Sequence, residues 1–230
     1  MAFEPRDRAV YLPAADALVV ADLHIGRDAA SNVHARLGEH GDLTERFDAL
    51  LAHYEPAEAV VAGDLLHSFD SLPTGTAETV HELREIAADA DCRLVVTPGN
   101  HDSMLDELWD GPTAGEYRLP ETDIVVTHGH EAPDTEADLY VVGHDHPTID
   151  IEGQRHPCYL HASDHYDGAD VLMLPPFSRV PAGALINTMS AGDFQSPLIK
   201  RTNVFRPIVR DEDADRTHEF PPLGEFRRML

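Results

Sequence analysis

The chain of 230 residues is long enough for one domain with a full hydrophobic core, and its 42% hydrophobic content excludes a disordered protein. Its formal net charge of −25, from 42 acidic and 17 basic residues, argues against DNA binding through a broadly basic face. Its longest apolar runs, such as ALVVA at 17–21, are too short to cross a bilayer, which excludes a helical membrane span.

The strong acidity has two explanations that the sequence leaves open. Acidic residues are spread along the chain and Lys200 is the only lysine, which favours a halophilic protein whose surface charge is screened by near-molar salt. An acidic surface that binds a protein partner is the alternative. Cys92 and Cys158 form no CxxC pair, and the N-terminus contains no apolar signal segment, so we expect a cytoplasmic protein without a disulfide framework.

The first half of the chain alternates expected strands and helices. Val-rich runs at 17–24, 59–67 and 93–102 have the continuous apolar character of strands that are buried on both faces. Between them, 37–55 and 74–90 have apolar residues at helical spacing. This β-α-β-α-β order predicts three parallel strands joined by right-handed crossovers, and therefore an α/β fold.

Two more Val-rich runs follow at 123–130 and 139–146, and the chain then changes to short strand-like segments separated by Pro, Gly and Asp. These segments predict a second, mostly antiparallel sheet packed on the first. They are 148–151, 158–162, 170–175, 184–187 and 203–210. We therefore expect one domain over 1–210, followed by an acidic C-terminal tail over 211–230 with little ordered structure.

All five Val-rich runs end in side chains of the types that bind metals. Because ligands bind beyond the carboxyl ends of parallel strands, we expect these ends to converge. Two carboxylates, an amide and four or more imidazoles are enough for two divalent ions, and Asp64 is the natural bridge because a carboxylate has two oxygens. Mixed oxygen and imidazole ligands favour Mn²⁺, with Fe or Zn²⁺ as alternatives. The candidate ligands are Asp22, His24, Asp64, Asn100, His101, His128, His144 and His146, with Asp102, His130 and Asp145 nearby.

Each of these segments alone has an ordinary explanation. The segment DLH at 22–24 is typical of a turn with a helix cap, and GD at 63–64 is a common turn pair. The segments GNHD at 99–102 and GHDH at 143–146 are harder to explain by packing, since several polar side chains crowd into one turn. Recurrence of the pattern after five similar strands favours one site over five unrelated turns.

The ordered series D-x-H, G-D, G-N-H-D, H and G-H-x-H, from Asp22 to His146, resembles the calcineurin-like metallophosphoesterase superfamily. Within it, the chain is most similar to the archaeal phosphoesterases related to the SbcD nuclease subunit, and to their bacterial relative, the ligase-associated DNA repair endonuclease. Leu66 stands where many relatives have a basic residue. The closer likeness lies in ADLHIG at 21–26, GDLLHSF at 63–69, GHDHP at 143–147, PCYLHA at 157–162 and LPPFSRVPAGALIN at 174–187.

The resemblance implies a four-layer α/β/β/α sandwich with a dinuclear metal site between the loops of its two sheets. His101 would not be a metal ligand. It is free to act as a general acid that protonates the leaving group, and Asp102 could orient its imidazole. The ligands implied are Asp22, His24, Asp64 and His146 for one metal, and Asp64, Asn100, His128 and His144 for the other.

We therefore expect a metal-dependent hydrolase that cleaves phosphodiesters by attack of a hydroxide bridging the two metals, with nucleic acid among the candidate substrates. His67 and Arg27 lie just past ligand turns and are weaker candidates for contacts with substrate phosphate; exposed loop residues are the alternative. Two other functions stay open: a small-nucleotide phosphatase, and a catalytically silent scaffold that binds a protein partner. The complete ligand set argues against the scaffold.

Overall fold

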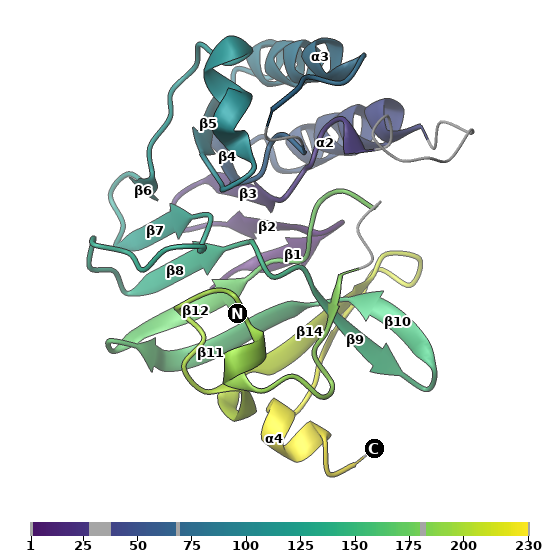
Figure 1. The fold of residues 1–230 in the computed structure, drawn as a ribbon, viewed down its shortest axis with the longest axis vertical. Coiled ribbons are helices and arrows are strands. Elements are labelled where there is room, and N and C mark those ends of the chain that lie inside the picture. The colour runs from purple at the N-terminus through teal and green to yellow at the C-terminus, as the bar shows by residue number, and fades with distance from the viewer. Residues whose placement is uncertain (1, 28–37, 68–69, 180–182, 230) are drawn as a thin grey trace.

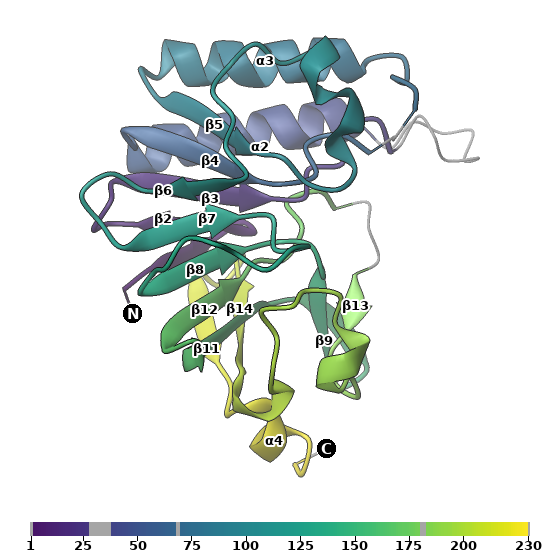
Figure 2. The ribbon, with the colours of Figure 1, turned by 60° about the vertical axis from the view of Figure 1, so that its left-hand side comes forward.

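The computed structural model describes residues 2–27, 38–67, 70–179 and 183–229. Two β-sheets lie face to face, and two long helices cover the outer face of the first sheet (Figures 1 and 2). None of the helices in these ranges combines the length and apolar character needed to cross a membrane. The architecture is the mixed α/β sandwich that the sequence predicts.

The first sheet has the strand order β1-β2-β3-β4-β5. Strands β3, β4 and β5 are parallel, and helices α2 and α3 connect them, which confirms the predicted β-α-β-α-β unit. An antiparallel hairpin, β1–β2, adds two strands that the sequence did not indicate. The bounds are β1 Glu4–Arg6, β2 Ala9–Leu12, β3 Ala17–Ala21, α2 Glu39–Tyr54, β4 Glu58–Ala62, α3 Thr76–Asp89 and β5 Arg93–Thr97.

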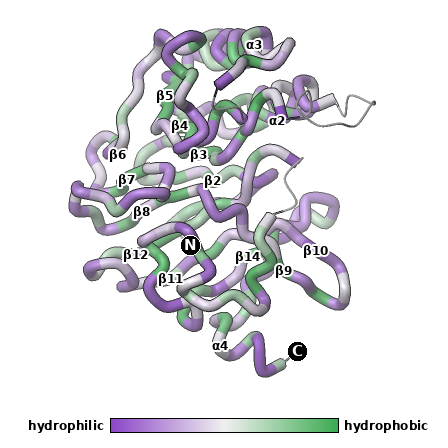
Figure 3. The backbone as a smooth tube through the Cα atoms, in the orientation of Figure 1, coloured by the Kyte–Doolittle hydropathy of each residue, from purple (hydrophilic) through white to green (hydrophobic). Residues whose placement is uncertain are grey.

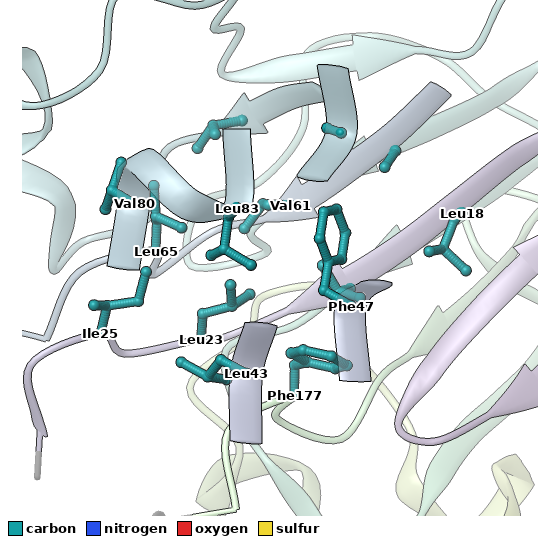
Figure 4. Packing of buried hydrophobic residues seen from close by; sticks show 14 of the residues in the cluster. Leu18, Leu23, Ile25, Leu43, Phe47, Val61, Leu65, Val80, Leu83 and Phe177 are labelled. Carbon is teal, nitrogen blue, oxygen red and sulfur yellow. The ribbon is translucent and has the colours of Figure 1, made fainter. Parts of the chain in front are cut away.

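Apolar residues at helical spacing fix both helices on this sheet. Leu43 and Phe47 of α2 and Leu83 of α3 are buried in one cluster with Val61 of β4 (Figure 4). All residues of β3 and β4 are buried because the helices cover one face and the second sheet covers the other. Figure 3 accordingly shows hydrophobic segments in the interior strands and mostly hydrophilic segments in the connecting loops.

The second sheet has the strand order β15-β14-β11-β12-β8-β7-β6. Strands β7, β8 and β12 are parallel to one another, and the other pairings are antiparallel, as predicted for most of this sheet. Val19 and Val60 of the first sheet pack with Val141 of the second in a shared cluster. The bounds are β6 Glu116–Arg118, β7 Ile124–Thr127, β8 Leu139–Val142, β11 Tyr159–Tyr166, β12 Ala169–Met173, β14 Arg206–Asp211 and β15 Arg216–Glu219.

The outer face of the second sheet is covered by a thin fourth layer. It contains a small sheet of order β10-β9-β13, two 3₁₀ turns and the short helix α4. These elements bury a second apolar cluster that includes Leu198 and Phe205. The bounds are β9 Pro147–Ile151, β10 Gln154–Pro157, β13 Ala184–Leu185, 3₁₀ turns Ala191–Asp193 and Thr202–Val204, and α4 Leu223–Phe226.

The segment after residue 210 differs from the acidic tail that the sequence predicts. Residue 210 lies inside β14, and β15 pairs with β14 in an antiparallel hairpin. Leu223 and Phe226 of α4 are buried against the second sheet. The few apolar residues of this segment therefore dock it on the domain despite its many acidic side chains.

Candidate metal centre

The seven predicted ligands lie in turns that begin where strands end. Asp22 and His24 follow β3, Asp64 follows β4, Asn100 follows β5, His128 follows β7, and His144 and His146 follow β8. Five of them have left-handed φ angles between 43° and 75°, which costs about 1 kcal/mol or more for a residue with a side chain. Such backbone strain is typical of functional sites, where the surrounding fold holds it. These five are Asp22, His24, Asp64, His144 and His146.

Four of these side chains form the first group of converging ligand atoms. His146 Nε2 lies 3.1 Å from His24 Nε2 and 3.5 Å from Asp22 Oδ1. His24 Nε2 lies 3.9 Å from Asp64 Oδ2. The ligand atoms of Asp22, His24 and His146 all lie within 4.8 Å of one another, a spacing at which one cation could contact all three.

The second group surrounds His128, which is fully buried. Its Nδ1 lies 3.3 Å from the carbonyl oxygen of Ala62, which assigns the proton to Nδ1 and leaves a lone pair on Nε2. That Nε2 lies 3.1 Å from Asn100 Oδ1, 3.0 Å from His144 Nδ1 and 3.6 Å from Asp64 Oδ2. Several acceptor atoms therefore face one point, where a cation would satisfy them together.

Asp64 lies between the two groups. Its Oδ2 lies 3.9 Å from His24 Nε2 and 3.6 Å from His128 Nε2, and its Oδ1 accepts a 2.9 Å hydrogen bond from the backbone N–H of His101. This is the position that the sequence predicts for a bridging carboxylate.

The imidazoles of His24, His128 and His144 are uncharged near neutral pH and so can offer lone pairs. Burial is the main cause: it lowers the pKa of His24 to about 3, and it lowers the pKa of His128 and of His144 to about 4. Neutral imidazole is the form that binds metals, so no proton has to be displaced from these rings at pH 7.

The two buried carboxylates leave negative charge that the described residues do not fully balance. Burial, and then the nearby Asp22, raise the pKa of Asp64 to about 8. Burial also disfavours the charge of Asp22, but His146 and then His128 and His24 bring the pKa of Asp22 below its ordinary value. Asp22 Oδ1 is buried without a hydrogen-bond partner among the described residues. Divalent cations fit this site, because it offers two carboxylates, one of which has an oxygen without a hydrogen-bond partner in the described part of the chain, and the lone pairs of neutral imidazoles.

The geometry agrees with comparisons to known proteins. A sequence model of the calcineurin-like phosphoesterases matches residues 16–131, half of the chain. The chain belongs to this family. It is therefore a metal-dependent phosphoesterase, a hydrolase. The crystal structure of the nuclease MPE from Pseudomonas putida shares its fold, with a TM-score of 0.65 and 24% identity over 95% of this chain and 100% of that one. No curated protein matches the chain.

Asp102 of this phosphoesterase has a different role from the one the sequence suggests. Its carboxylate accepts hydrogen bonds from the backbone N–H groups of Leu65 (3.2 Å), Leu66 (2.8 Å) and Gly99 (2.8 Å). The Nδ1 of His101 instead lies 2.8 Å from the carbonyl oxygen of His67. Asp102 therefore ties the GNHD turn to the GDLLH turn, and the His67 carbonyl orients the His101 ring.

Asp145 does for the GHDH turn what Asp102 does for the GNHD turn. It is buried, and its two carboxylate oxygens accept hydrogen bonds from the backbone N–H groups of Gln195 (2.8 Å) and Ser196 (3.0 Å). The backbone N–H of His144 donates to Asp22 Oδ2 at 2.9 Å and joins the ends of β8 and β3. The ligand turns are therefore fixed by carboxylate-to-backbone bonds as well as by the strands.

The two weaker candidates lie beside the metal centre. The ring of His67 stacks on that of His101 with centroids 5.8 Å apart, and His24, His67 and His101 form a further group of converging ligand atoms. Burial, then repulsion from Arg27 and His101, lowers the pKa of His67. Arg27 is thus close enough to His67 to lower its pKa. Both residues lie beside the centre, on the side of His101.

Three glycines let the ligand turns approach one another, a role that the sequence analysis missed. A Cβ added to Gly63 would lie 2.0 Å from His128 Nδ1, one added to Gly99 2.2 Å from Asp64 Oδ1, and one added to Gly143 2.6 Å from Asp22 Oδ2. Each of these glycines precedes or faces a ligand in the motifs GD, GN and GH. Their position in the motif is the signal that could have indicated close backbone approach.

Gly99→Ala should destabilise the protein and weaken its metal binding together. The added Cβ would also lie 2.6 Å from the backbone nitrogen of Asp64, so the carboxylate of Asp64 has to move. We expect a loss of about 1–3 kcal/mol in the free energy of unfolding in urea, and a smaller rise in Tm on addition of Mn²⁺. Gly115→Ala is the matched control, since its Cβ would meet nothing within 4 Å. Equal effects in both variants would contradict the steric explanation.

Proposed function

We propose that this phosphoesterase hydrolyses phosphodiesters at two divalent ions held by the seven residues of the metal centre. The observation that supports this most directly is the pair of adjoining ligand groups that share Asp64 Oδ2. One ion would be bound by Asp22, His24, Asp64 and His146, and the other by Asp64, Asn100, His128 and His144. Bound there, such ions supply positive charge to the phosphoryl oxygens and lower the pKa of water.

The chain's own residues supply the remaining requirements of the reaction. We propose that His101 donates a proton to the leaving oxygen from Nε2, because its Nδ1 is engaged with the His67 carbonyl and its ring is only partly buried. Asp102 is a positioning residue, which fixes the turn that presents His101. His67 and Arg27 would contact the phosphate from the same side.

The choice of substrate and ion is also part of the proposal. The motifs shared with SbcD-related phosphoesterases, together with the fold shared with a nuclease, favour a nucleic-acid phosphodiester over a small nucleotide. The mixture of carboxylate, amide and imidazole ligands favours Mn²⁺. The scattered acidic residues favour a protein adapted to the salt of a halophile's cytoplasm.

The proposal is tested by removing and restoring metal. We expect protein stripped with a chelator to be inactive on bis-p-nitrophenyl phosphate, and activity to return with Mn²⁺ more fully than with Zn²⁺ or Mg²⁺. Running the series from low to near-molar KCl shows at which salt the protein remains folded. If metal raises the Tm but neither diesters nor monoesters are cleaved, the hydrolase mechanism fails and the scaffold function replaces it.

A further inference from the structure

A cluster of five arginines lies on the edge of the sandwich that holds the metal centre. Its members are Arg6, Arg8, Arg46, Arg179 and Arg210. Strand β2 runs antiparallel to β3, so the β1–β2 turn at Asp7 and Arg8 lies at the same edge as Asp22. Strand β14 runs parallel to β12 and β8 through β11, so Arg210 at its end reaches this edge from the second sheet. The β1–β2 turn is one to two strand spacings, about 5–10 Å, from the end of β3.

Four of the five arginines in this cluster are paired with carboxylates. Their partners are the four acids Asp7, Asp42, Glu212 and Asp215. Asp211 and Asp213 lie in the same segment as Glu212 and Asp215, so an excess of positive charge is confined to one cavity, whose lining has three arginines against two carboxylates. The four paired arginines are Arg6, Arg46, Arg179 and Arg210.

Arg8 is the arginine of the cluster that forms no ion pair with any residue that the structure describes. Its Nη1 donates to the backbone carbonyls of Pro176 (3.3 Å) and Ser178 (2.7 Å). Its Nε and Nη2 have no partner among the described residues, and neither is sealed in the interior. This free edge of the guanidinium has the two parallel N–H groups that bind a phosphate in bidentate fashion.

The backbone at Arg8 is in the left-handed region, which strains a residue with a side chain. Arg6 pairs with Ala9, which leaves a two-residue hairpin turn, and Asp7 and Arg8 have φ angles of 42° and 66°. Turns with two positive φ angles favour Asn or Asp followed by Gly. Here an arginine occupies the position that glycine prefers, and its bonds to the Pro176 and Ser178 carbonyls help to hold the turn.

A cavity of about 160 Å³ lies in front of Arg8. It is lined by Arg8, Arg179, Arg210, Pro157, Tyr159 and Pro175, together with the paired carboxylates of Asp7 and Glu212. Burial, then repulsion from Arg46 and Arg179, lowers the pKa of Arg8 to about 10, so the group stays charged at neutral pH and an anion beside it would be stabilised. Ser178 connects this cavity to the centre, since its carbonyl accepts from Arg8 and its N–H donates to the Asp22 carbonyl at 3.4 Å.

We propose that Arg8 binds a second phosphate of the substrate, one or two phosphodiesters from the bond that is cleaved. The inference rests on the proposed function and narrows it to chains with more than one phosphodiester, which means oligonucleotides. Arg179 and Arg210 extend the positive surface along the path of the strand. The local excess of charge at Arg8 also explains how so acidic a protein can bind a polyanion away from its metal ions.

The test compares Arg8→Gly with wild type on two substrates and in a binding assay. Glycine suits the turn, so this variant should fold, and a thermal melt checks that. We expect kcat/KM for an oligothymidylate to fall about ten- to a hundredfold relative to kcat/KM for bis-p-nitrophenyl phosphate, which has one phosphodiester. Arg8→Lys, which keeps the charge but loses the two parallel N–H groups, should recover part of the loss.

Binding of a fluorescein-labelled oligothymidylate, measured by anisotropy with chelator present, separates this proposal from the proposed function. We expect Arg8→Gly to weaken binding and to lower the slope of log Kd against log salt by about 0.7, at the lowest salt where the protein is folded. Arg93→Gln is the matched control, because Arg93 lies at the start of β5 on the opposite edge. Equal oligonucleotide binding by wild type and Arg8→Gly would overturn the role of Arg8, whereas failure of wild type on bis-p-nitrophenyl phosphate would overturn the proposed function.

Discussion

Asp64→Asn should abolish metal-dependent hydrolysis while leaving the metal-free protein at least as stable as wild type. The asparagine keeps one oxygen but loses the negative charge that both ligand groups share, so we expect kcat/KM to fall at least a hundredfold and the Mn²⁺-dependent rise in Tm to disappear. Hydrolysis of bis-p-nitrophenyl phosphate and thermal melts with and without Mn²⁺ measure the two effects.

The stability of the metal-free protein should depend on pH through this same carboxyl group. Burial raises the pKa of Asp64 to about 8, well above the value near 3.8 of an unfolded chain. Between these two values the folded state binds more protons than the unfolded state, so the free energy of unfolding falls as pH rises from about 4 to about 8. Asp64→Asn removes that dependence, and Asp48→Asn, on the exposed face of α2, should keep it.

Two outcomes would contradict this account of Asp64. If the variant retains its Mn²⁺-dependent rise in Tm, Asp64 is not a shared ligand. If the chelator-stripped variant is less stable than stripped wild type at pH 8, the Asp64 carboxylate stabilises the fold, and its repulsion by Asp22 is not a net cost to the folded state. Asp48→Asn shows whether any change reflects the loss of one negative charge from a highly acidic chain.

The alternation of strands and helices could be predicted because Val-rich runs and apolar helical spacing are local patterns. The β1–β2 hairpin could not, since its short strands end in Asp7-Arg8 rather than in the Asn-Gly or Asp-Gly pair that indicates such a turn. The acidic composition of the segment after residue 210 indicated little ordered structure, so the pairing of β15 with β14 was not predicted. Two buried apolar residues of α4 are enough to dock the segment on the domain.

The convergence of the candidate ligands could be predicted, but the contacts that support them could not. Strand ends that converge bring the metal-type residues together, so order along the chain was sufficient to predict which side chains lie close to one another. Asp102 is adjacent to His101 in sequence, yet its carboxylate binds N–H groups of two separate turns. A backbone N–H or carbonyl that bonds to a side chain from a distant turn leaves no mark on its own residue type, and for that reason the His67 carbonyl was also missed.

His101→Ala should slow turnover by about a hundredfold or more on diesters with poor leaving groups, and much less on p-nitrophenyl esters. An alkoxide needs a proton as it departs, whereas nitrophenolate leaves without one. Comparing kcat for a dinucleotide with kcat for bis-p-nitrophenyl phosphate therefore reports on proton donation. His81→Ala, on the exposed face of α3, is the matched control and should change neither value.

Metal binding distinguishes a general acid at this position from a ligand. The ligand atoms of His24, His67 and His101 also converge, so a third ion in that group would be an alternative use of His101. The Nε2 of His101 is 3.9 Å from Asp64 Oδ2, and its Nδ1 is engaged with the His67 carbonyl. A general acid predicts that His101→Ala keeps the wild-type number of bound Mn²⁺ ions and the wild-type rise in Tm. Loss of an ion, together with equal losses of kcat on both leaving groups, would identify His101 as a ligand and leave the departing oxygen without its proton donor.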